Sequence, residues 1–250
     1  MGMIKAITFD FWGTLFIEGP EYAGRVKNLR NEILLDAASE AGVPAEPAAV
    51  MEAWRQAALD FDAAWNAGQA MTPFERVTRI FAYLGLPYDE GLVALTTQRI
   101  VEAALQGSLV PLPGVLEALP KLAQRYTLGI VSDTSVSTGR ILREQLMRHK
   151  LHDLFSGFSF SDETGVVKPH PEAFLAALDE MGAKPQEALH IGDIPRTDIA
   201  GAFQTGYPYA VLFTGHTHRN GQPEPSARIG NHLELFPLLE NVFGHPPRAL

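Results

Sequence analysis

The chain has 250 residues, with 20 lysines and arginines against 29 aspartates and glutamates, and it contains no cysteine. The absence of thiols excludes a cysteine nucleophile, a disulfide framework and any metal site built on thiolates. The net charge of −9 argues against a general binder of nucleic acid or anionic membranes, although one basic pocket can still bind an anionic substrate. No apolar run approaches the roughly 20 residues of a membrane span, and Met1 to Lys5 lack the features of a signal peptide, so we expect a cytoplasmic protein.

Short apolar runs alternate with helical stretches along most of the chain. Strands are expected at residues 4–9, 127–132, 155–160, 188–191 and 209–213, and helices at residues 115–124, 138–147, 171–181 and 198–205. This alternation is typical of βαβ units on a parallel sheet, in which ligands bind at the carboxyl ends of the strands. We therefore expect an α/β fold, with residues 215–228 as a surface loop and residues 244–250 frayed.

Residues 22–106 break this alternation, because they contain helical patterns and no convincing strand. The expected helices cover residues 25–41, 48–66, 73–84 and 90–106. We therefore expect a helical lid at residues 19–108, inserted into a core formed by residues 1–18 and 109–250. Trp54, Phe61 and Trp65 fall near helical spacing, so they are expected in the core of this insertion or on its face toward the active site.

Carboxylates follow two of the expected strands. Asp10 ends the first strand, where a carboxylate can serve as a covalent nucleophile or a metal ligand, or can simply cap a turn. Asp193 and Asp198 share a loop after a later strand, and two carboxylates on one loop suit a hard cation such as Mg²⁺. For Asp198 the alternative is that it caps the helix that follows.

A serine and a lysine occupy two further positions of interest. Ser132 ends another expected strand, where its hydroxyl can bind an anion or form part of a turn. Lys168 lies between an apolar run and a helix, and Pro169 and Pro171 restrict the chain around it. A lysine held in this way beside two acidic strand ends is expected to neutralise them.

Taken together, these segments resemble the haloacid dehalogenase (HAD) superfamily of hydrolases. The matching residues are FDFWGTLF at 9–16, IVSD at 130–133, GVVKPHPEAF at 165–174 and HIGDIPRTDIAGA at 190–202. The resemblance covers residues 4 to about 213 and implies a Rossmann-like parallel-sheet core. It also implies that the helical insertion after the first motif corresponds to the cap of subfamily I.

The resemblance implies a role for each motif residue. Asp10 would be the nucleophile that forms an acyl-enzyme intermediate, and Lys168 would stabilise the charge between Asp10 and the transferred group. The hydroxyls of Thr14 and Ser132 would bind that group. The other residues expected to contact substrate are Trp12, Gly13, Asp133, Thr134 and, on the insertion, Arg55.

The same resemblance implies a bound Mg²⁺ ion. Asp10, the backbone carbonyl of Trp12 and Asp193 would be its ligands, and Asp198 would hold metal-bound water. A carboxylate that attacks a phosphate needs the repulsion between two anions suppressed, and Mg²⁺, Lys168 and backbone amides can do this.

Position 12 departs from the pattern of the family's phosphatases, which place a second aspartate two residues after the nucleophile. Trp12 cannot take up and return a proton, so the usual general acid–base is missing. The family's haloacid dehalogenases also carry an aromatic residue there, because a halide leaves without protonation. Trp54-Arg55-Gln56 resembles one of their segments, in which the arginine binds substrate; alternatively, Arg55 is a solvated helix residue.

Other departures argue against a dehalogenase. That group has no metal, with serine and asparagine where this chain has Gly192 and Asp193, asparagine in place of Asp133, and tyrosine in place of Phe174. Without a cation, Asp10, Asp193 and Asp198 would crowd one pocket, and at least one would be protonated. The sequence therefore favours a Mg²⁺-dependent phosphatase over a metal-independent dehalogenase.

The sequence leaves several alternatives open. Asp133 and His170 are the first candidates for a replacement acid, although local structural roles are favoured for both, and a good leaving group needs no acid. The expected substrate is a small phosphorylated metabolite, with no nucleic acid or membrane partner and with monomer or homodimer undecided. The alternatives are the 2-haloacid dehalogenase, with Arg55 on the substrate, and a catalytically weak relative that binds a phosphorylated ligand or a protein partner.

Overall fold

The computed structural model describes residues 3–242, and its centre is a six-stranded parallel sheet. The strand order is β5-β4-β1-β6-β7-β8. The strands are Ala6–Phe9 (β1), Thr127–Ser132 (β4), Phe155–Phe160 (β5), Ala188–Gly192 (β6), Tyr209–Phe213 (β7) and Ala227–Ile229 (β8). This arrangement confirms the α/β, Rossmann-like fold expected from the alternating pattern.

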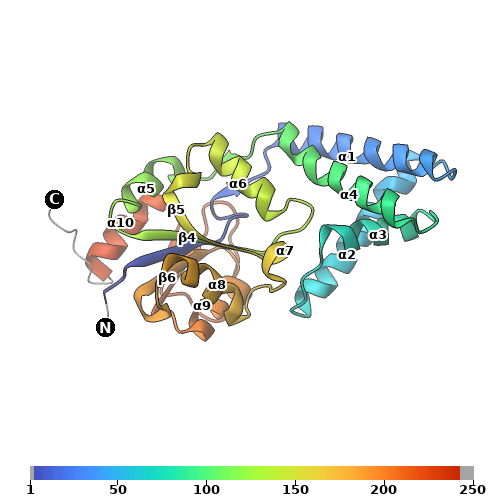
Figure 1. Cartoon of the computed structure of the whole chain (residues 1–250). Coiled ribbons are helices and arrows are strands. Elements are labelled where there is room, and N and C mark those ends of the chain that lie inside the picture. The colour runs from blue at the N-terminus through green and yellow to red at the C-terminus, as the bar shows by residue number, and fades with distance from the viewer. Residues whose placement is uncertain (1–2, 243–250) are drawn as a thin grey trace.

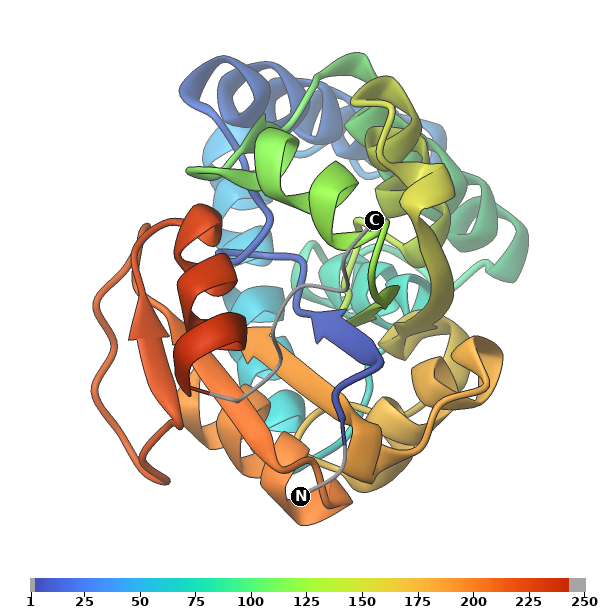
Figure 2. The same ribbon diagram turned by 90° about the vertical axis from the view of Figure 1, so that its left-hand side faces the viewer.

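Helices cover both faces of the sheet, which explains why its central strands are almost continuously apolar. Helices α5, α6 and α10 lie on one side in Figure 1, and α8 and α9 lie on the other; Figure 2 shows the same two layers from the end of the sheet. The helices of the core are Val115–Leu122 (α5), Gly139–Arg148 (α6), Ser161–Thr164 (α7), Pro171–Met181 (α8), Ala200–Thr205 (α9) and Leu235–Pro237 (α10). All four residues of β1 are buried between these layers.

Four helices follow the first strand and form the helical insertion, at the right of Figure 1. They are Pro20–Glu40 (α1), Pro47–Asn66 (α2), Pro73–Tyr83 (α3) and Glu90–Ala103 (α4). Two short strands, Phe16–Ile17 (β2) and Val110–Pro111 (β3), pair antiparallel where the chain leaves and re-enters the core. This pairing places both connections of the insertion side by side.

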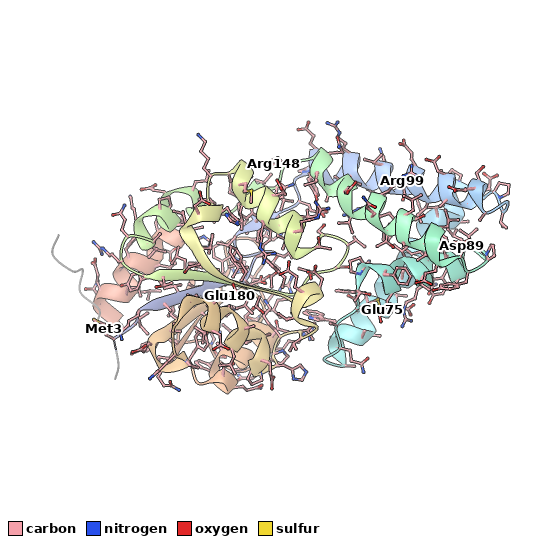
Figure 3. All side chains as sticks on the ribbon, viewed as in Figure 1. Met3, Glu75, Asp89, Arg99, Arg148 and Glu180 are labelled. Atoms are coloured by element: carbon pink, nitrogen blue, oxygen red, sulfur yellow. The ribbon has the colours of Figure 1, made fainter. Side chains whose placement is uncertain are left out.

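Local signals in the sequence fix where the helices of the insertion begin. Proline occupies the first turn of α1, α2 and α3, where its missing N–H costs nothing. Thr72 and Glu75 form a reciprocal capping box at the start of α3, and Asp89 accepts from the Leu92 N–H at the start of α4. Glu75 and Asp89 are labelled on the insertion in Figure 3. Helix α1 begins five residues before the expected Arg25 because Pro20 starts it.

The C-terminal part of the core differs from the sequence-based prediction. Strand β8 begins at Ala227, inside the segment expected to be a loop, and short helical turns cover His232–Glu234 and Leu238–Val242. A three-residue strand is too short for its periodicity to be recognised, and only its pairing with β7 identifies it. The expected fraying of residues 244–250 concerns residues outside those described.

No helix within residues 3–242 has the length and apolar character needed to cross a membrane.

Candidate functional site

Three neighbouring strands bring the predicted polar residues to one edge of the sheet. β1 lies between β4 and β6, and Asp10, Ser132 and Asp193 lie at the carboxyl ends of these three strands. Because β4 and β6 flank β1 on opposite sides, the loops that follow these strands diverge and leave a crevice at the carboxyl end of β1. The Asp10 N–H donates to the Ile191 carbonyl at 2.8 Å, so strand pairing continues to the first residue of the loop.

Asp10, Asp193 and Asp198 form a buried cluster of carboxylates, each offering one oxygen within 4.8 Å of the others. The Oδ1 atom of Asp193 is buried and has no hydrogen-bond partner. Gly13 has a φ of 73°, and a Cβ at this position would lie 2.7 Å from Asp193 Oδ2, so both its backbone and its position require glycine. Hard carboxylate oxygens, one of them unpaired, fit the ligand chemistry of Mg²⁺.

Lys168 is the cation at the centre of this cluster. Its Nζ donates to Asp10 Oδ1 at 2.6 Å and to Asp198 Oδ1 at 2.7 Å, and its side chain is 4% exposed. Burial opposes its charge, but the carboxylates of Asp10 and Asp198 outweigh this effect and raise the pKa of Lys168. The sequence therefore located both the lysine and the two carboxylates that it contacts.

The carboxyl groups of the cluster respond differently to this environment. Burial raises the pKa of Asp10, and the charges of Asp198 and Asp193 add to this effect against the opposing charge of Lys168. Burial and then Asp198 raise the pKa of Asp193 to about 6. Burial also acts on Asp198, but Lys168 and His190 together hold its pKa below the ordinary value. Lys168 and Arg219, whose Nε lies 3.4 Å from Asp193 Oδ2, supply two positive charges against three carboxylates. A divalent cation would therefore still stabilise the cluster.

This charge imbalance predicts how Mg²⁺ changes stability with pH. The pKa of Asp193 rises from about 3.8 to about 6 on folding, so the folded protein binds the extra proton and stability falls as the pH rises through that window. The loss is on the order of 2–3 kcal/mol. We expect Mg²⁺ to raise the melting temperature of EDTA-treated protein much more at pH 7.5 than at pH 5, as measured by thermal denaturation.

The Asp193→Asn variant is the matched control, because it removes the charge while keeping the shape of the side chain. It should weaken both the pH dependence and the Mg²⁺ effect. An equal Mg²⁺ effect at both pH values in the wild type would contradict the assignment of Asp193 to the cation.

His190, on β6, supports the cluster from inside the core, and the sequence-based reasoning gave it no role. Its Nε2 lies 3.3 Å from Asp198 Oδ1, and its Nδ1 lies 2.9 Å from the Thr8 hydroxyl. Burial lowers the pKa of His190, so the ring is neutral and can donate to Asp198 while accepting from Thr8. The sequence did contain a signal for this role: a histidine within an otherwise apolar strand is buried, and a buried ring needs hydrogen-bond partners on both nitrogens.

The predicted hydroxyl residues differ in how free they are to contact a ligand. The Thr14 hydroxyl lies 3.3 Å from Asp10 Oδ2, and Ser132 is buried with its hydroxyl at 3.5 Å from the Asp133 carbonyl, a weak contact. The Thr134 hydroxyl, in contrast, donates to Asp162 Oδ1 at 2.5 Å, and the Thr134 N–H donates to Ser161 Oγ at 2.8 Å. Thr134 therefore holds its own loop in place.

Asp133 links the insertion to the core. Its Oδ2 accepts from Trp65 Nε1 on α2 at 2.8 Å, and its Oδ1 accepts from the Lys168 N–H at 2.9 Å. The guanidinium of Arg196 lies 4.0 Å from the Trp65 ring centroid. Both oxygens of Asp133 thus have structural partners. Of the two positions expected for Trp65, the core of the insertion or its face toward the active site, the structure shows the second.

A cleft of about 670 Å³ lies between the insertion and the core, lined by residues of α1, α2 and α3, by the loop at residues 133–137 and by Trp12. Trp54 and Phe61 form part of its apolar wall. Arg55 also lines the cleft, but its side chain is 58% exposed and forms an ion pair with Glu52 at 2.6 Å. The structure therefore places Arg55 beside the cleft with its charge already paired.

Two other arginines, Arg30 and Arg76, reach the cleft from α1 and α3. Neither was among the residues predicted to bind substrate. A signal was present, because Arg30 lies four residues after the buried Val26 and three before the buried Ile33, on the apolar face of α1. An arginine on an apolar helix face is expected either to pair or to meet a ligand.

Comparisons with known proteins place this geometry in a family. The family model described as "haloacid dehalogenase-like hydrolase" matches residues 4–206. The phosphoglycolate phosphatase of Rhodospirillum rubrum is 30% identical over 233 residues, which cover 91% of this chain and 85% of that protein. The crystal structure of 2-haloacid dehalogenase from Pseudomonas syringae pv. Tomato DC3000 superposes with a TM-score of 0.71 at 25% identity, covering 97% of this chain and 100% of that one.

Other curated relatives match over a shorter span. The glyceraldehyde 3-phosphate phosphatase of Methanopyrus kandleri is 36% identical over 141 residues, or 54% of this chain, and the match spans 58% of its length. The match to the phosphoserine phosphatase of Thermus thermophilus spans 50% of that protein. The motifs, the fold and the matched family model agree, and this chain belongs to the haloacid dehalogenase-like hydrolases.

Proposed function

We propose that this hydrolase is a Mg²⁺-dependent phosphatase that acts on a small phosphate monoester through an aspartyl-phosphate on Asp10. The observation that carries the proposal is the buried carboxylate cluster, in which Asp193 keeps an unpaired oxygen beside Asp10. A metal-independent dehalogenase has no need of this excess charge. The curated relatives named as phosphatases support the same reaction class.

The proposed reaction has two steps on the same carboxylate. One oxygen of Asp10 attacks phosphorus, and the phosphorus–oxygen bond to the leaving group breaks with its electron pair going to the leaving oxygen. Water then attacks phosphorus, the bond to Asp10 breaks, and phosphate leaves with both hydrogens of the water. Lys168, at 2.6 Å from Asp10, stabilises the charge that builds up between carboxylate and phosphoryl group.

The remaining motif residues take supporting roles in this proposal. Asp10, Asp193, the Trp12 carbonyl and, through water, Asp198 would hold Mg²⁺. When bound, the ion supplies charge neutralisation of the phosphoryl oxygens. Thr14, Ser132 and free amides of the loop after Asp10 bind the phosphoryl group. The Gly13 amide is not one of them, because it donates to the Phe16 carbonyl at 2.9 Å. The helical insertion acts as a cap, and Trp65 on α2 excludes water from this side through its contact with Asp133.

Trp12 sets a requirement on the leaving group. The usual acid at this position is absent, and Asp133 accepts hydrogen bonds from Trp65 and from the Lys168 N–H, which favours a structural role for it. An aryl or acyl phosphate needs little protonation of its leaving oxygen, whereas an alkyl phosphate needs much more. The enzyme therefore prefers substrates with good leaving groups.

The Trp12→Asp variant tests this requirement. We expect it to raise kcat/KM for an alkyl phosphate relative to an aryl phosphate by about 10²-fold, because it restores a general acid next to the leaving oxygen. Steady-state kinetics with both esters measures the ratio. Trp12→Asn is the matched control, because asparagine has nearly the size of aspartate but no titratable proton. An alkyl-to-aryl ratio of kcat/KM in Trp12→Asp equal to that of the wild type would refute the requirement.

The proposed activity itself is tested by phosphate release from 4-nitrophenyl phosphate with Mg²⁺ and with EDTA. We expect turnover that is lost in EDTA and restored by Mg²⁺, after which phosphorylated metabolites, including phosphoglycolate and glyceraldehyde 3-phosphate, can be screened.

The second candidate is a 2-haloacid dehalogenase, favoured by the aromatic Trp12 and by the structural likeness to a protein of that name. Halide release from 2-chloropropionate in EDTA, without phosphatase activity, would establish that candidate instead.

A further inference from the structure

The guanidinium groups of Arg30 and Arg76 line the cleft without a carboxylate partner. Within residues 3–242, no ion pair includes either of them, although Glu18 lines the same cleft. Arg30 donates to the carbonyls of Ile100 and Val136 and to the Ser137 hydroxyl, all of them neutral acceptors. Two positive charges therefore line the cleft without an ion pair to a carboxylate.

Arg76 has the larger unsatisfied hydrogen-bonding capacity. Its Nη1 donates to the Ser135 hydroxyl, and its Nε is buried without a partner. Burial and then the charge of Arg30 lower the pKa of Arg76 to about 10, against a smaller opposing effect of Asp62, so the group stays charged at neutral pH. Burying a charge without a counter-ion is costly, and an anion in the cleft would offset that cost.

Aromatic side chains hold this guanidinium and extend the surface beside it. Its Cζ lies 5.1 Å from the Phe61 ring centroid and 5.7 Å from that of Trp54. Trp12, next to the nucleophile loop, lines the same cleft. A cation fixed against aromatic rings, with Trp12 of the loop after Asp10 lining the same cleft, fits a flat apolar group that ends in an anion.

We propose that Arg76 binds a carboxylate carried by the leaving group of the substrate, so that the enzyme selects phosphate esters of apolar, carboxylated alcohols or phenols. This inference rests on the proposed phosphatase function for the position of the phosphoryl group at Asp10 and Lys168. The rest of the ester then extends past Trp12 into the cleft. Arg30 is committed to neutral acceptors and Arg55 to Glu52. Lys27 also lines the cleft but is exposed, so Arg76 is the partly buried cation best placed to bind one negative charge.

The test compares phenyl phosphate with 4-carboxyphenyl phosphate, which differ in the carboxylate. We expect wild-type kcat/KM to be at least about 10-fold higher for the carboxylated ester, because charge-assisted hydrogen bonds to a partly buried arginine discriminate strongly. Arg76→Gln should lower kcat/KM for that ester by about 10- to 100-fold, mainly through KM, and leave phenyl phosphate within about 3-fold.

Arg79→Gln is the matched control, because Arg79 lies on the same helix and pairs with Asp60 outside the cleft lining. It should leave both esters unchanged, and Arg76→Lys should recover part of the preference by restoring charge. The absence of a preference in the wild type, or an equal loss on both esters in Arg76→Gln, would overturn the inference. An equal loss would mean that Arg76 only supports the fold of the insertion.

A failure of the proposed function is distinguishable from a failure of this inference. If the wild type hydrolyses neither ester, calorimetry with 4-hydroxybenzoate and with phenol decides the question. Binding of 4-hydroxybenzoate that is lost in Arg76→Gln, with no comparable binding of phenol, supports the carboxylate site. No binding of 4-hydroxybenzoate to the wild type would overturn it.

Discussion

Replacing Asp10 by asparagine is expected to reduce kcat on 4-nitrophenyl phosphate by a factor on the order of 10⁴ or more, because the amide cannot form the aspartyl-phosphate. The substitution keeps the size of the side chain, and the Lys168 ammonium can still donate to the amide oxygen. The folded structure should therefore be retained. Phosphate release under saturating substrate and Mg²⁺ measures the effect.

Asp153→Asn is the matched control for this variant, because the Asp153 side chain is fully exposed and belongs neither to the carboxylate cluster nor to the cleft lining. It should keep wild-type turnover. Residual activity of Asp10→Asn within about tenfold of the wild type would mean that water, and not Asp10, attacks phosphorus.

Replacing Lys168 by methionine is expected to reduce kcat by about 10²- to 10³-fold, because the side chain no longer neutralises the charge between Asp10 and the phosphoryl group. The variant also leaves buried carboxylates without their cation, a change that costs about 3–5 kcal/mol when a buried pair is broken. We therefore expect a lower melting temperature in EDTA, which Mg²⁺ partly restores without restoring turnover.

Lys121→Met is the corresponding control, since Lys121 forms an exposed ion pair with Glu117 within one helix. Such pairs contribute roughly 0–1 kcal/mol, so both stability and turnover should change little. Wild-type turnover in Lys168→Met would contradict the role assigned to Lys168.

The residues at the strand ends were predictable because topology alone brings them together. Parallel strands place their carboxyl ends at one edge, so Asp10, Ser132 and Asp193 had to meet once the strands were identified. Lys168 was predictable because two prolines restrict its segment, and the structure places its Nζ against Asp10 and Asp198. The positions of these residues follow from local sequence patterns and from the alternation of strands and helices, which can be read from a single sequence.

The cleft residues were harder to predict because they come from separate helices. How far Arg55 and Arg76 reach into the cleft depends on how α2 and α3 are rotated against the core, and the pattern of apolar residues fixes this rotation only approximately. The contact between Trp65 and Asp133 joins residues 68 positions apart, and no local signal specifies it. Strand β8 was missed for a similar reason, since its identity depends on its pairing with β7.

The most direct test of the proposed mechanism is detection of the phosphorylated nucleophile. Wild-type protein turning over 4-nitrophenyl phosphate with Mg²⁺ would be quenched in acid, digested and examined by mass spectrometry, with Asp10→Asn treated in parallel. The account predicts one phosphoryl group on Asp10 in the wild type and none in the variant. Turnover with no phosphoryl group on Asp10, or with the group on another residue, would contradict it.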